Sequence, residues 1–157
     1  MSQSERPEVG RRFHLDELAV GQKFESASHT VELGEMVAYA RQFDPQPFHL
    51  DDAGARGTLF GGLAASGWYT ASLTMRLIVG GGLPLMGGII GSGGEITWPL
   101  PTRAGDTLKV VSEVMEVVPS RSRPDRGRVK MRCETRNQRG ETVQILIANL
   151  VVPKRPV

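Results

Sequence analysis

The pattern of apolar and polar positions predicts a helix in the first third of the chain. Apolar residues recur at helical spacing within residues 31–43, and Thr30 is placed to cap a helix there. This helix must end near Asp44, because Pro45 and Pro47 follow at once and cannot continue it. The residues that follow are therefore expected to form an ordered loop.

Residues 62–79 are predicted to form a second helix. Its side chains are apolar or small on nearly every side, and Arg76 is the only charged residue between Gly57 and Gly94. A helix of this kind is expected to be buried on all sides, which in a small domain means that a sheet wraps it. The glycines at 80–82 break any helix long enough to span a membrane, so we expect no membrane association.

The rest of the chain is dominated by patterns typical of strands, in which apolar and polar residues alternate. The predicted strands cover residues 13–24, 89–98, 106–118, 128–136 and 143–151. Residues 137–140 form a polar turn that ends in glycine, which predicts a hairpin between the last two strands. The order of elements predicts an α+β domain, with an antiparallel sheet of five to six strands around a buried central helix.

Composition and charge narrow the class of protein. The 157 residues predict one domain at 11–157, with a flexible polar tail at 1–10. A net charge of only +2 does not indicate a nucleic-acid-binding protein, which usually carries a strong basic excess. Cys133 is the only cysteine, so no intrachain disulfide can form, and its strand position predicts a buried thiol. The start of the chain has no apolar leader, which predicts a cytoplasmic protein.

His49 is the most promising of the three histidines as a catalytic group. It follows Asp44 by five residues, with Pro45 and Pro47 between them, and the prolines stiffen this loop. A stiff loop can hold an imidazole and a carboxylate toward one site, as acid–base catalysis requires. The alternative is that Asp44 merely ends the helix and His49 only forms a hydrogen bond in the loop. His14 and His29 lie in polar segments and are expected at the surface.

The spacing of acidic residues and histidines does not match the usual zinc motifs, so we expect no metal site.

Gly61 and Gly62 stand where the second helix is predicted to begin. The first turn of a helix has unpaired N–H groups and favours negative charge, so the Gly62 N–H is a candidate donor to an oxyanion. The alternative is that both glycines only allow close packing or a sharp turn. Ser66 lacks the setting of a nucleophilic serine, so we assign it a supporting role.

Candidate substrate-binding residues lie in two places. The segment from Ser120 to Arg128 is a basic turn in which Arg121 and Arg123 are candidates to bind ligand phosphates, the alternative being a solvated hairpin. Trp68, Tyr69 and Met86 are candidates to shape an apolar pocket, together with the connection at 80–94.

With these residues in view, the sequence resembles the MaoC-like dehydratases, which include the (R)-specific enoyl-CoA hydratases. Their motif Asp-x-Asn-Pro-x-His corresponds to Asp44-Pro-Gln-Pro-Phe-His49, with Gln46 in place of asparagine. Residues 60–67 match the family's glycine and serine at the central helix, with Gly62 and Ser66 in their places and Gly61 in place of a frequent histidine. Residues 98–107 and 136–141 are similar to its later connections, so the resemblance covers 13–152.

The resemblance implies a hot-dog fold and a homodimer, or a higher homo-oligomer, with sheets joined edge to edge. It implies an acyl-thioester hydratase or dehydratase of fatty acid metabolism, acting on an acyl-CoA or on acyl carrier protein without a metal or redox cofactor. Asp44 and His49 would activate one water, the Gly62 N–H would bind the thioester oxygen, and Gln46 and Ser66 would support them.

Two other functions are compatible with this fold. The first is an acyl-CoA thioesterase, which usually needs a carboxylate on the central helix, but residues 63–75 contain no acidic residue. The second is a non-catalytic acyl-CoA-binding subunit, against which the intact pair of Asp44 and His49 speaks.

Overall fold

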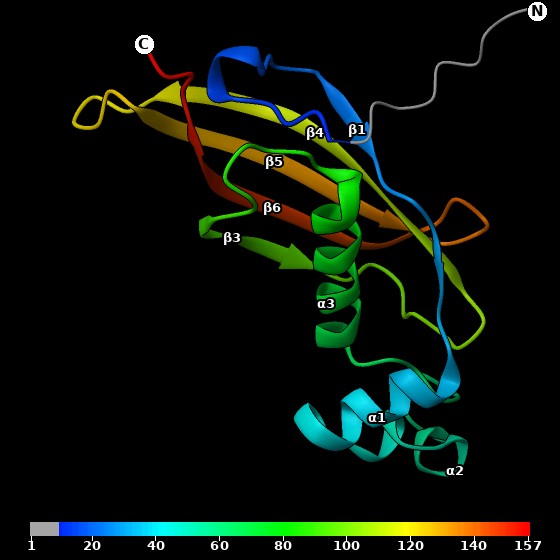
Figure 1. Ribbon diagram of the computed structural model, residues 1–157. Coiled ribbons are helices and arrows are strands. Elements are labelled where there is room, and N and C mark those ends of the chain that lie inside the picture. Colours follow the sequence, from blue (N-terminus) through cyan, green and yellow to red (C-terminus); the bar gives the residue numbers. More distant parts are fainter. Residues whose placement is uncertain (1–9) are drawn as a thin grey trace, which may run out of the picture.

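A six-stranded antiparallel sheet is the largest part of the fold (Figure 1). The computed structural model describes residues 10–157. The strands are β1 (Lys23–Glu25), β2 (His29–Thr30), β3 (Gly91–Thr97), β4 (Thr107–Pro119), β5 (Arg126–Arg136) and β6 (Thr142–Pro153). Their order is β1-β4-β5-β6-β3, with β2 paired to β4 beside this path. The sheet packs against the helix α3 (Gly67–Leu77), which confirms the α+β class and the hot-dog arrangement.

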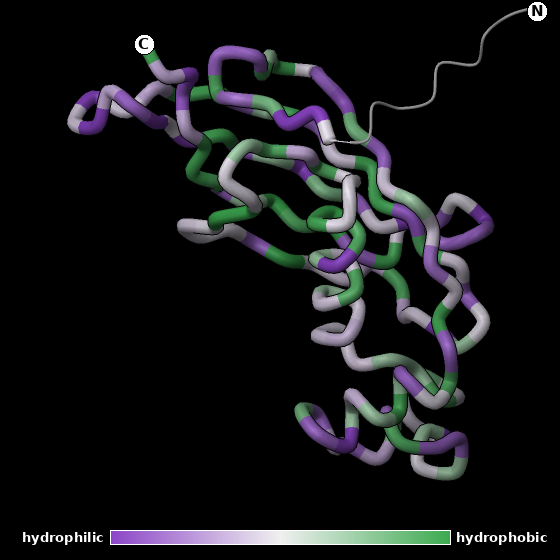
Figure 2. The backbone as a smooth tube through the Cα atoms, viewed as in Figure 1, coloured by the Kyte–Doolittle hydropathy of each residue, from purple (hydrophilic) through white to green (hydrophobic). Residues whose placement is uncertain are grey.

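The three long strands form because, over most of their length, their residues alternate between a buried and a partly exposed face. Val114 on β4 lies opposite Met131 on β5, which in turn lies opposite Ala148 on β6. These three side chains belong to one hydrophobic cluster beneath the sheet. Figure 2 shows the same alternation as green and purple segments along the strands. Cys133 is buried in this cluster as predicted, and burial raises the pKa of its thiol.

The helices lie on one side of the sheet and beyond its end (Figure 1). They are the α-helices α1 (Leu33–Phe43), α2 (Asp52–Ala55) and α3 (Gly67–Leu77), the 3-10 helices η1 (Leu15–Glu17) and η2 (Pro47–His49), and the π-helix η3 (Ile78–Gly82). A second hydrophobic cluster joins α1 to α3 through Met36, Tyr69 and Leu73. This cluster sets the position of α1, whose last turn leads directly into Asp44.

Two predictions about the N-terminal region are wrong. Thr30 does not cap α1, because it pairs with Thr107 in β2, and the N-cap residue is Glu32. The strand predicted at 13–24 is confined to its last two residues, which belong to β1. The remainder is irregular chain that contains η1 and one turn, and the Glu17 carboxylate accepts a hydrogen bond from the His14 N–H at the start of η1. The predicted tail at 1–10 lies, apart from Gly10, outside the described residues.

α3 is buried on one face only, which differs from the expectation of burial on all sides. Tyr69 and Leu73 face the interior and are 3% exposed, whereas Trp68 is 55% and Met75 39% exposed. The reason is that the sheet covers one side of the helix and nothing else in residues 10–157 covers the other. No helix in the described part of the chain has the length and apolar character needed to cross a membrane.

The buried contact between α1 and α3 yields a stability prediction. Met36 is fully buried, so we expect Met36→Ala to lower the free energy of unfolding by about 2–5 kcal/mol through lost burial and a cavity. Leu33 lies on the same helix but is 54% exposed, so Leu33→Ala is the matched control, with an expected change of less than about 0.5 kcal/mol. Urea denaturation measures both values, and equal losses in the two variants would contradict the assigned helix orientation.

Candidate functional site

Asp44 and His49 face each other at the end of α1. Asp44 is the residue at which α1 ends, and Pro47 begins the 3-10 helix η2, which ends at His49. The short η2 turns the chain back, so that Nε2 of His49 lies 3.4 Å from Oδ2 of Asp44. The structure therefore brings together the two side chains that the sequence singled out.

Two hydrogen bonds hold the Asp44 carboxylate. The hydroxyl of Ser66 donates to Oδ2 at 2.7 Å, and the amide of Gln46 donates to Oδ1 at 2.6 Å. Partial burial by itself would raise the pKa of Asp44, but these two bonds and the neighbouring His49 lower the pKa to a net value below the ordinary one. Asp44 is consequently an ionised carboxylate at neutral pH.

The ring of His49 is fixed on both of its sides. Its Nδ1 lies 2.8 Å from the carbonyl oxygen of Ala64, and because a carbonyl only accepts, Nδ1 must carry a hydrogen. Nε2 is the atom that faces Asp44. The rings of Phe48 and Phe60 pack against the imidazole, with centroids 4.6 and 5.6 Å from its own, and His49 is only 5% exposed. This packing fixes the ring with Nε2 toward the carboxylate.

The predicted start of the central helix at Gly62 is wrong, because α3 begins at Gly67. Ser66 is the N-cap residue, and its Oγ accepts a hydrogen bond from the Trp68 N–H at 3.2 Å. The Tyr69 N–H donates to the carbonyl of Ser66. Within residues 10–157 the Gly67 N–H donates to no protein atom, so the unpaired donor at the helix start belongs to Gly67.

A cavity of about 520 Å³ opens beside these groups. Its walls contain Asp44, His49, Leu59, Phe60, Ala65, Gly67, Trp68, Thr70, Trp98, Pro99, Leu100, Pro101 and Thr102. Apart from the carboxylate, the imidazole and the two threonine hydroxyls, the side chains of this lining are apolar or aromatic. The cavity thus joins an acid–base pair and a helix N-terminus to a surface that suits an apolar group. Gly62 is not part of its wall.

The proposed substrate-binding residues divide into those at the cavity and those away from it. Trp68 lines the cavity, as expected. Tyr69 points to the opposite side of α3, where its hydroxyl donates to Glu35 at 3.2 Å; burial and this carboxylate raise the pKa of the phenol. Arg121 and Arg123 lie in the exposed β4–β5 turn, at the end of the sheet far from α1 (Figure 1). Met86 follows the other end of α3 and does not line the cavity.

The other two histidines are outside this site. His14 contacts Glu17 at 3.2 Å, and His29 lies 3.7 Å from Glu35; both are half-buried rather than fully at the surface. In the part of the chain that the structure covers, no three His, Cys, Asp or Glu side chains gather closely enough to hold a metal.

Three groups at the candidate site were not predicted from the sequence: the Gly67 N–H, the Ala64 carbonyl and the indole of Trp98. A signal for the first was present, because serine is a preferred N-cap residue and Ser66 directly precedes Gly67. The role of Ala64 depends on a backbone atom and leaves no trace in the side-chain pattern. Trp98 reaches the site through the fold, since its ring packs on Gly67 from the end of β3.

Comparison with known proteins places the chain in one family. The family model described as the MaoC like domain matches residues 16–138. A 3-hydroxybutyryl-CoA dehydratase from Methylorubrum extorquens is 34% identical over 122 residues, which span 74% of this chain and 73% of that protein.

Solved structures show the same relationship. The structure of a MaoC-like dehydratase from Rhodospirillum rubrum is 56% identical with a TM-score of 0.90, covering 92% of this chain and 99% of that one. The R-hydratase PhaJ1 from Pseudomonas aeruginosa is 30% identical with a TM-score of 0.73, covering 92% of this chain and 88% of that one.

The contact between Gly67 and Trp98 predicts that a larger residue at position 67 destabilises the protein. A Cβ at Gly67 would lie 2.7 Å from Cε2 of Trp98, whose indole N–H is held by Gln144 at 3.0 Å. We therefore expect Gly67→Ala to lower the free energy of unfolding by about 1–3 kcal/mol. Gly62→Ala is the control, because a Cβ there would meet no atom closer than 3.7 Å, and we expect a change within about 0.5 kcal/mol. If denaturant titrations gave the reverse order, the close packing of the Trp98 ring on Gly67 would be contradicted.

Proposed function

This chain belongs to the MaoC-like dehydratase family, and we propose that it is a hydro-lyase that adds or removes water across the C2–C3 bond of an acyl thioester. One observation carries the proposal: the Asp44 carboxylate and Nε2 of His49 lie 3.4 Å apart on the wall of a cavity that also contains the start of α3. Hydration of a conjugated thioester needs a group that activates water and a donor for the charge that develops on the thioester oxygen.

Asp44 and His49 bind and activate the attacking water. One O–H of the water donates to the ionised Asp44 carboxylate and the other to Nε2 of His49, whose Nδ1–H stays with Ala64. The water oxygen bonds to C3 as its proton passes to Asp44, and the pair of electrons of the double bond moves onto the thioester as an enolate. Asp44 then returns this proton to C2, so that the hydroxyl and the hydrogen both come from one water. Dehydration follows the same steps in reverse.

The N-terminus of α3 stabilises the enolate. The Gly67 N–H is unpaired within the described residues, and the positive end of the helix dipole adds to its effect. This position replaces Gly62 as the oxyanion donor, since Gly62 precedes the helix by several residues and is not on the cavity wall. Ser66 supports both parts of the site, because its hydroxyl binds Asp44 while it caps α3.

The substrate is an acyl-CoA or an acyl carrier protein thioester, with no cofactor besides the thioester itself. The apolar cavity wall accommodates an acyl chain, and Trp68 and Trp98, in edge-to-face contact at 5.2 Å, form part of it. A relative described as a 3-hydroxybutyryl-CoA dehydratase and one described as an R-hydratase support this substrate class.

Removal of either catalytic side chain tests the proposal. With crotonyl-CoA we expect the wild-type protein to consume the enoyl-thioester absorbance, and Asp44→Asn and His49→Ala each to slow turnover by about 10²–10⁴-fold. His14→Ala is the matched control, since His14 lies outside the cavity and its loss should leave turnover unchanged.

A parallel assay for free thiol distinguishes hydration from hydrolysis. Loss of absorbance without thiol release supports a hydratase, whereas thiol release without hydrated product would identify a thioesterase. Near-normal rates in both Asp44→Asn and His49→Ala would overturn the catalytic assignment. Enoyl thioesters of CoA and of acyl carrier protein, tested side by side over several chain lengths, identify the carrier and the preferred acyl group.

We further propose that two copies of the chain form a homodimer along β3. In the described chain β3 pairs only with β6, and most of its residues are exposed. An exposed strand edge offers unpaired backbone groups to a second strand. The exposed side chains of α3 and η3 include Trp68 and Met75 on α3 and Val79 on η3, the last of them 56% exposed. Trp68 contacts Trp98, the residue that follows β3, so this apolar face continues to the end of β3. A twofold arrangement that joins the two β3 edges would cover this apolar face.

A charge on the exposed face of α3 tests the dimer. We expect the wild-type protein to sediment as a dimer and Met75→Lys to shift it toward the monomer, because a lysine at this interface would be desolvated. Met115→Lys is the control, since Met115 is similarly exposed (44% against 39%) but lies on β4. A wild-type monomer at micromolar concentration, or dissociation of both variants alike, would contradict the proposed interface.

A further inference from the structure

We propose that Arg103 is a positioning residue that holds the segment Phe60–Gly67 in the shape that catalysis requires. The inference rests on the proposed hydratase function, in which Asp44, His49 and the Gly67 N–H act together. Arg103 does not line the cavity, so its effect must pass through the segment that it binds.

The segment before α3 contributes to every part of the site. The carbonyl of Ala64 fixes Nδ1 of His49, the hydroxyl of Ser66 binds Asp44, and the Gly67 N–H is the proposed oxyanion donor. The ring of Phe60 packs on the imidazole. From Gly57 to Ser66 the backbone forms no regular helix or strand. The catalytic geometry therefore depends on a stretch that secondary structure does not stabilise.

Arg103 supplies hydrogen bonds that this stretch lacks. Its Nη1 donates to the carbonyls of Gly62 at 2.8 Å and Leu63 at 3.2 Å, and its Nη2 donates to the carbonyl of Phe60 at 2.7 Å. Three backbone oxygens, which a helix or sheet would otherwise satisfy, thus converge on one guanidinium. The planar fork of arginine suits this arrangement, whereas the ammonium of a lysine is a compact point charge.

The charge of Arg103 is directed at these carbonyls and not at a carboxylate side chain. Among residues 10–157 it forms no ion pair, and the nearby Asp52 carboxylate instead accepts the Leu63 N–H at 2.9 Å. A cation that binds only carbonyls makes charge-assisted bonds, which are stronger than neutral ones. The hydrogen bonds of the Arg103 guanidinium therefore go to the segment Phe60–Gly67.

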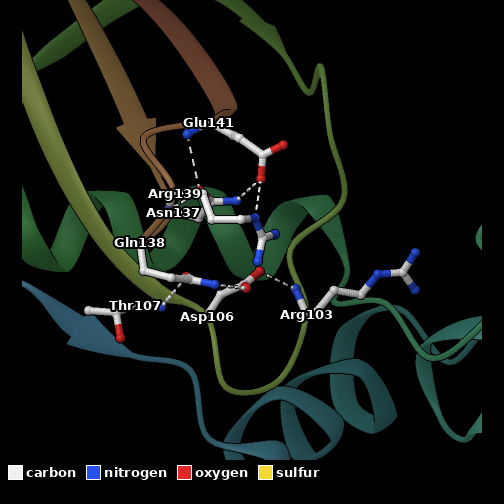
Figure 3. Close-up of polar contacts among 7 residues, drawn as sticks. All are labelled: Arg103, Asp106, Thr107, Asn137, Gln138, Arg139 and Glu141. Carbon is white, nitrogen blue, oxygen red and sulfur yellow. Dashed lines mark hydrogen bonds and ion pairs between the residues drawn. The ribbon is translucent and has the colours of Figure 1, made fainter.

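The backbone of Arg103 is itself anchored to the sheet (Figure 3). Its N–H donates to Oδ2 of Asp106 at 2.8 Å, and Oδ1 of Asp106 accepts from the amide of Gln138 at 3.0 Å. Gln138 also accepts the Thr107 N–H at 2.9 Å. Figure 3 shows the Arg103 side chain extended away from this cluster. Arg103 thus connects the rigid start of β4 and the β5–β6 turn to the irregular segment.

Loss of the guanidinium has a specific electrostatic consequence. If the segment loosens, the Ser66 hydroxyl no longer stays within bonding distance of Asp44. That bond lowers the pKa of Asp44, so its loss raises the pKa. Because the proposed base is the ionised form, the acidic limb of the pH profile of kcat/KM must then move to higher pH. A residue with only a general structural role would lower the amount of folded enzyme without moving this limb.

The test compares Arg103→Met and Arg103→Lys with the wild type and with Arg128→Met. Arg128 is exposed on β5 outside the site, so its variant controls for the loss of one positive charge. In crotonyl-CoA hydration we expect Arg103→Met to lower kcat by about 10- to 100-fold, with a small change in KM, because misplaced groups slow the chemical step. Its acidic limb should lie at higher pH, Arg103→Lys should be intermediate, and Arg128→Met should match the wild type.

Two measurements on the same variants do not depend on turnover. Hydrogen exchange of residues 57–66 should become faster in Arg103→Met, and a carbon-13 titration should show a raised pKa of the Asp44 carboxyl. The inference would be overturned if Arg103→Met had the same kcat, the same hydrogen exchange at residues 57–66 and the same pKa of the Asp44 carboxyl as the wild type. If the wild type hydrates no enoyl thioester, the proposed function fails, while exchange and titration still decide the role of Arg103. Should Arg103→Met not fold, Arg103→Gln enters the same comparison.

Discussion

The site depends on one hydroxyl group, that of Ser66, which joins the end of one helix to the start of another. As a donor it binds the Asp44 carboxylate where α1 ends, and as an acceptor it caps the Trp68 N–H where α3 begins. A hydroxyl has one proton to donate, and here that proton is committed to Asp44. The position of the carboxylate, its lowered pKa and the direction of the α3 N-terminus are therefore coupled, because each requires the same side chain in the same rotamer.

A buried polar chain gives α3 a defined position against the sheet. Thr74 lies 2.7 Å from Thr135, oxygen to oxygen, and also accepts a hydrogen bond from Gln144, which in turn accepts the indole N–H of Trp98. Apolar contacts alone would tolerate small shifts of the helix, whereas a fully paired polar chain has one arrangement in which all partners are satisfied. The last member of this series of hydrogen bonds is Trp98, whose ring packs on Gly67. The position of α3 along the sheet and the shape of the cavity therefore depend on the same contacts.

The sequence predicted the elements whose cause is local. The helix before Asp44 follows from periodicity and from the prolines that stop it, and the long strands follow from alternation, because both depend on neighbours in the chain. The pairing of Asp44 with His49 was also accessible, since Pro45 and Pro47 restrict the loop between them. The start of α3 could not be predicted from the sequence, because the apolar run after Gly62 has the composition of a helix. Its backbone is held in an irregular form by Arg103, which is far away in sequence. One-sided burial of α3 and the remote position of Arg121 and Arg123 likewise depend on the assembled sheet.

The irregular backbone before α3 follows from what the site demands of it. In a helix, the Ala64 carbonyl would point along the helix axis toward a helical N–H instead of toward His49, and Gly67 would no longer carry a first-turn N–H. Both groups are free for the site only because the helix begins late. The backbone groups left without helical partners must then be satisfied by side chains, which Asp52 and Arg103 provide. Because α3 begins at Gly67 and not at Gly62, the Ala64 carbonyl and the Gly67 N–H are available to the site. The same late start is the reason that Asp52 and Arg103 must bind the backbone before the helix.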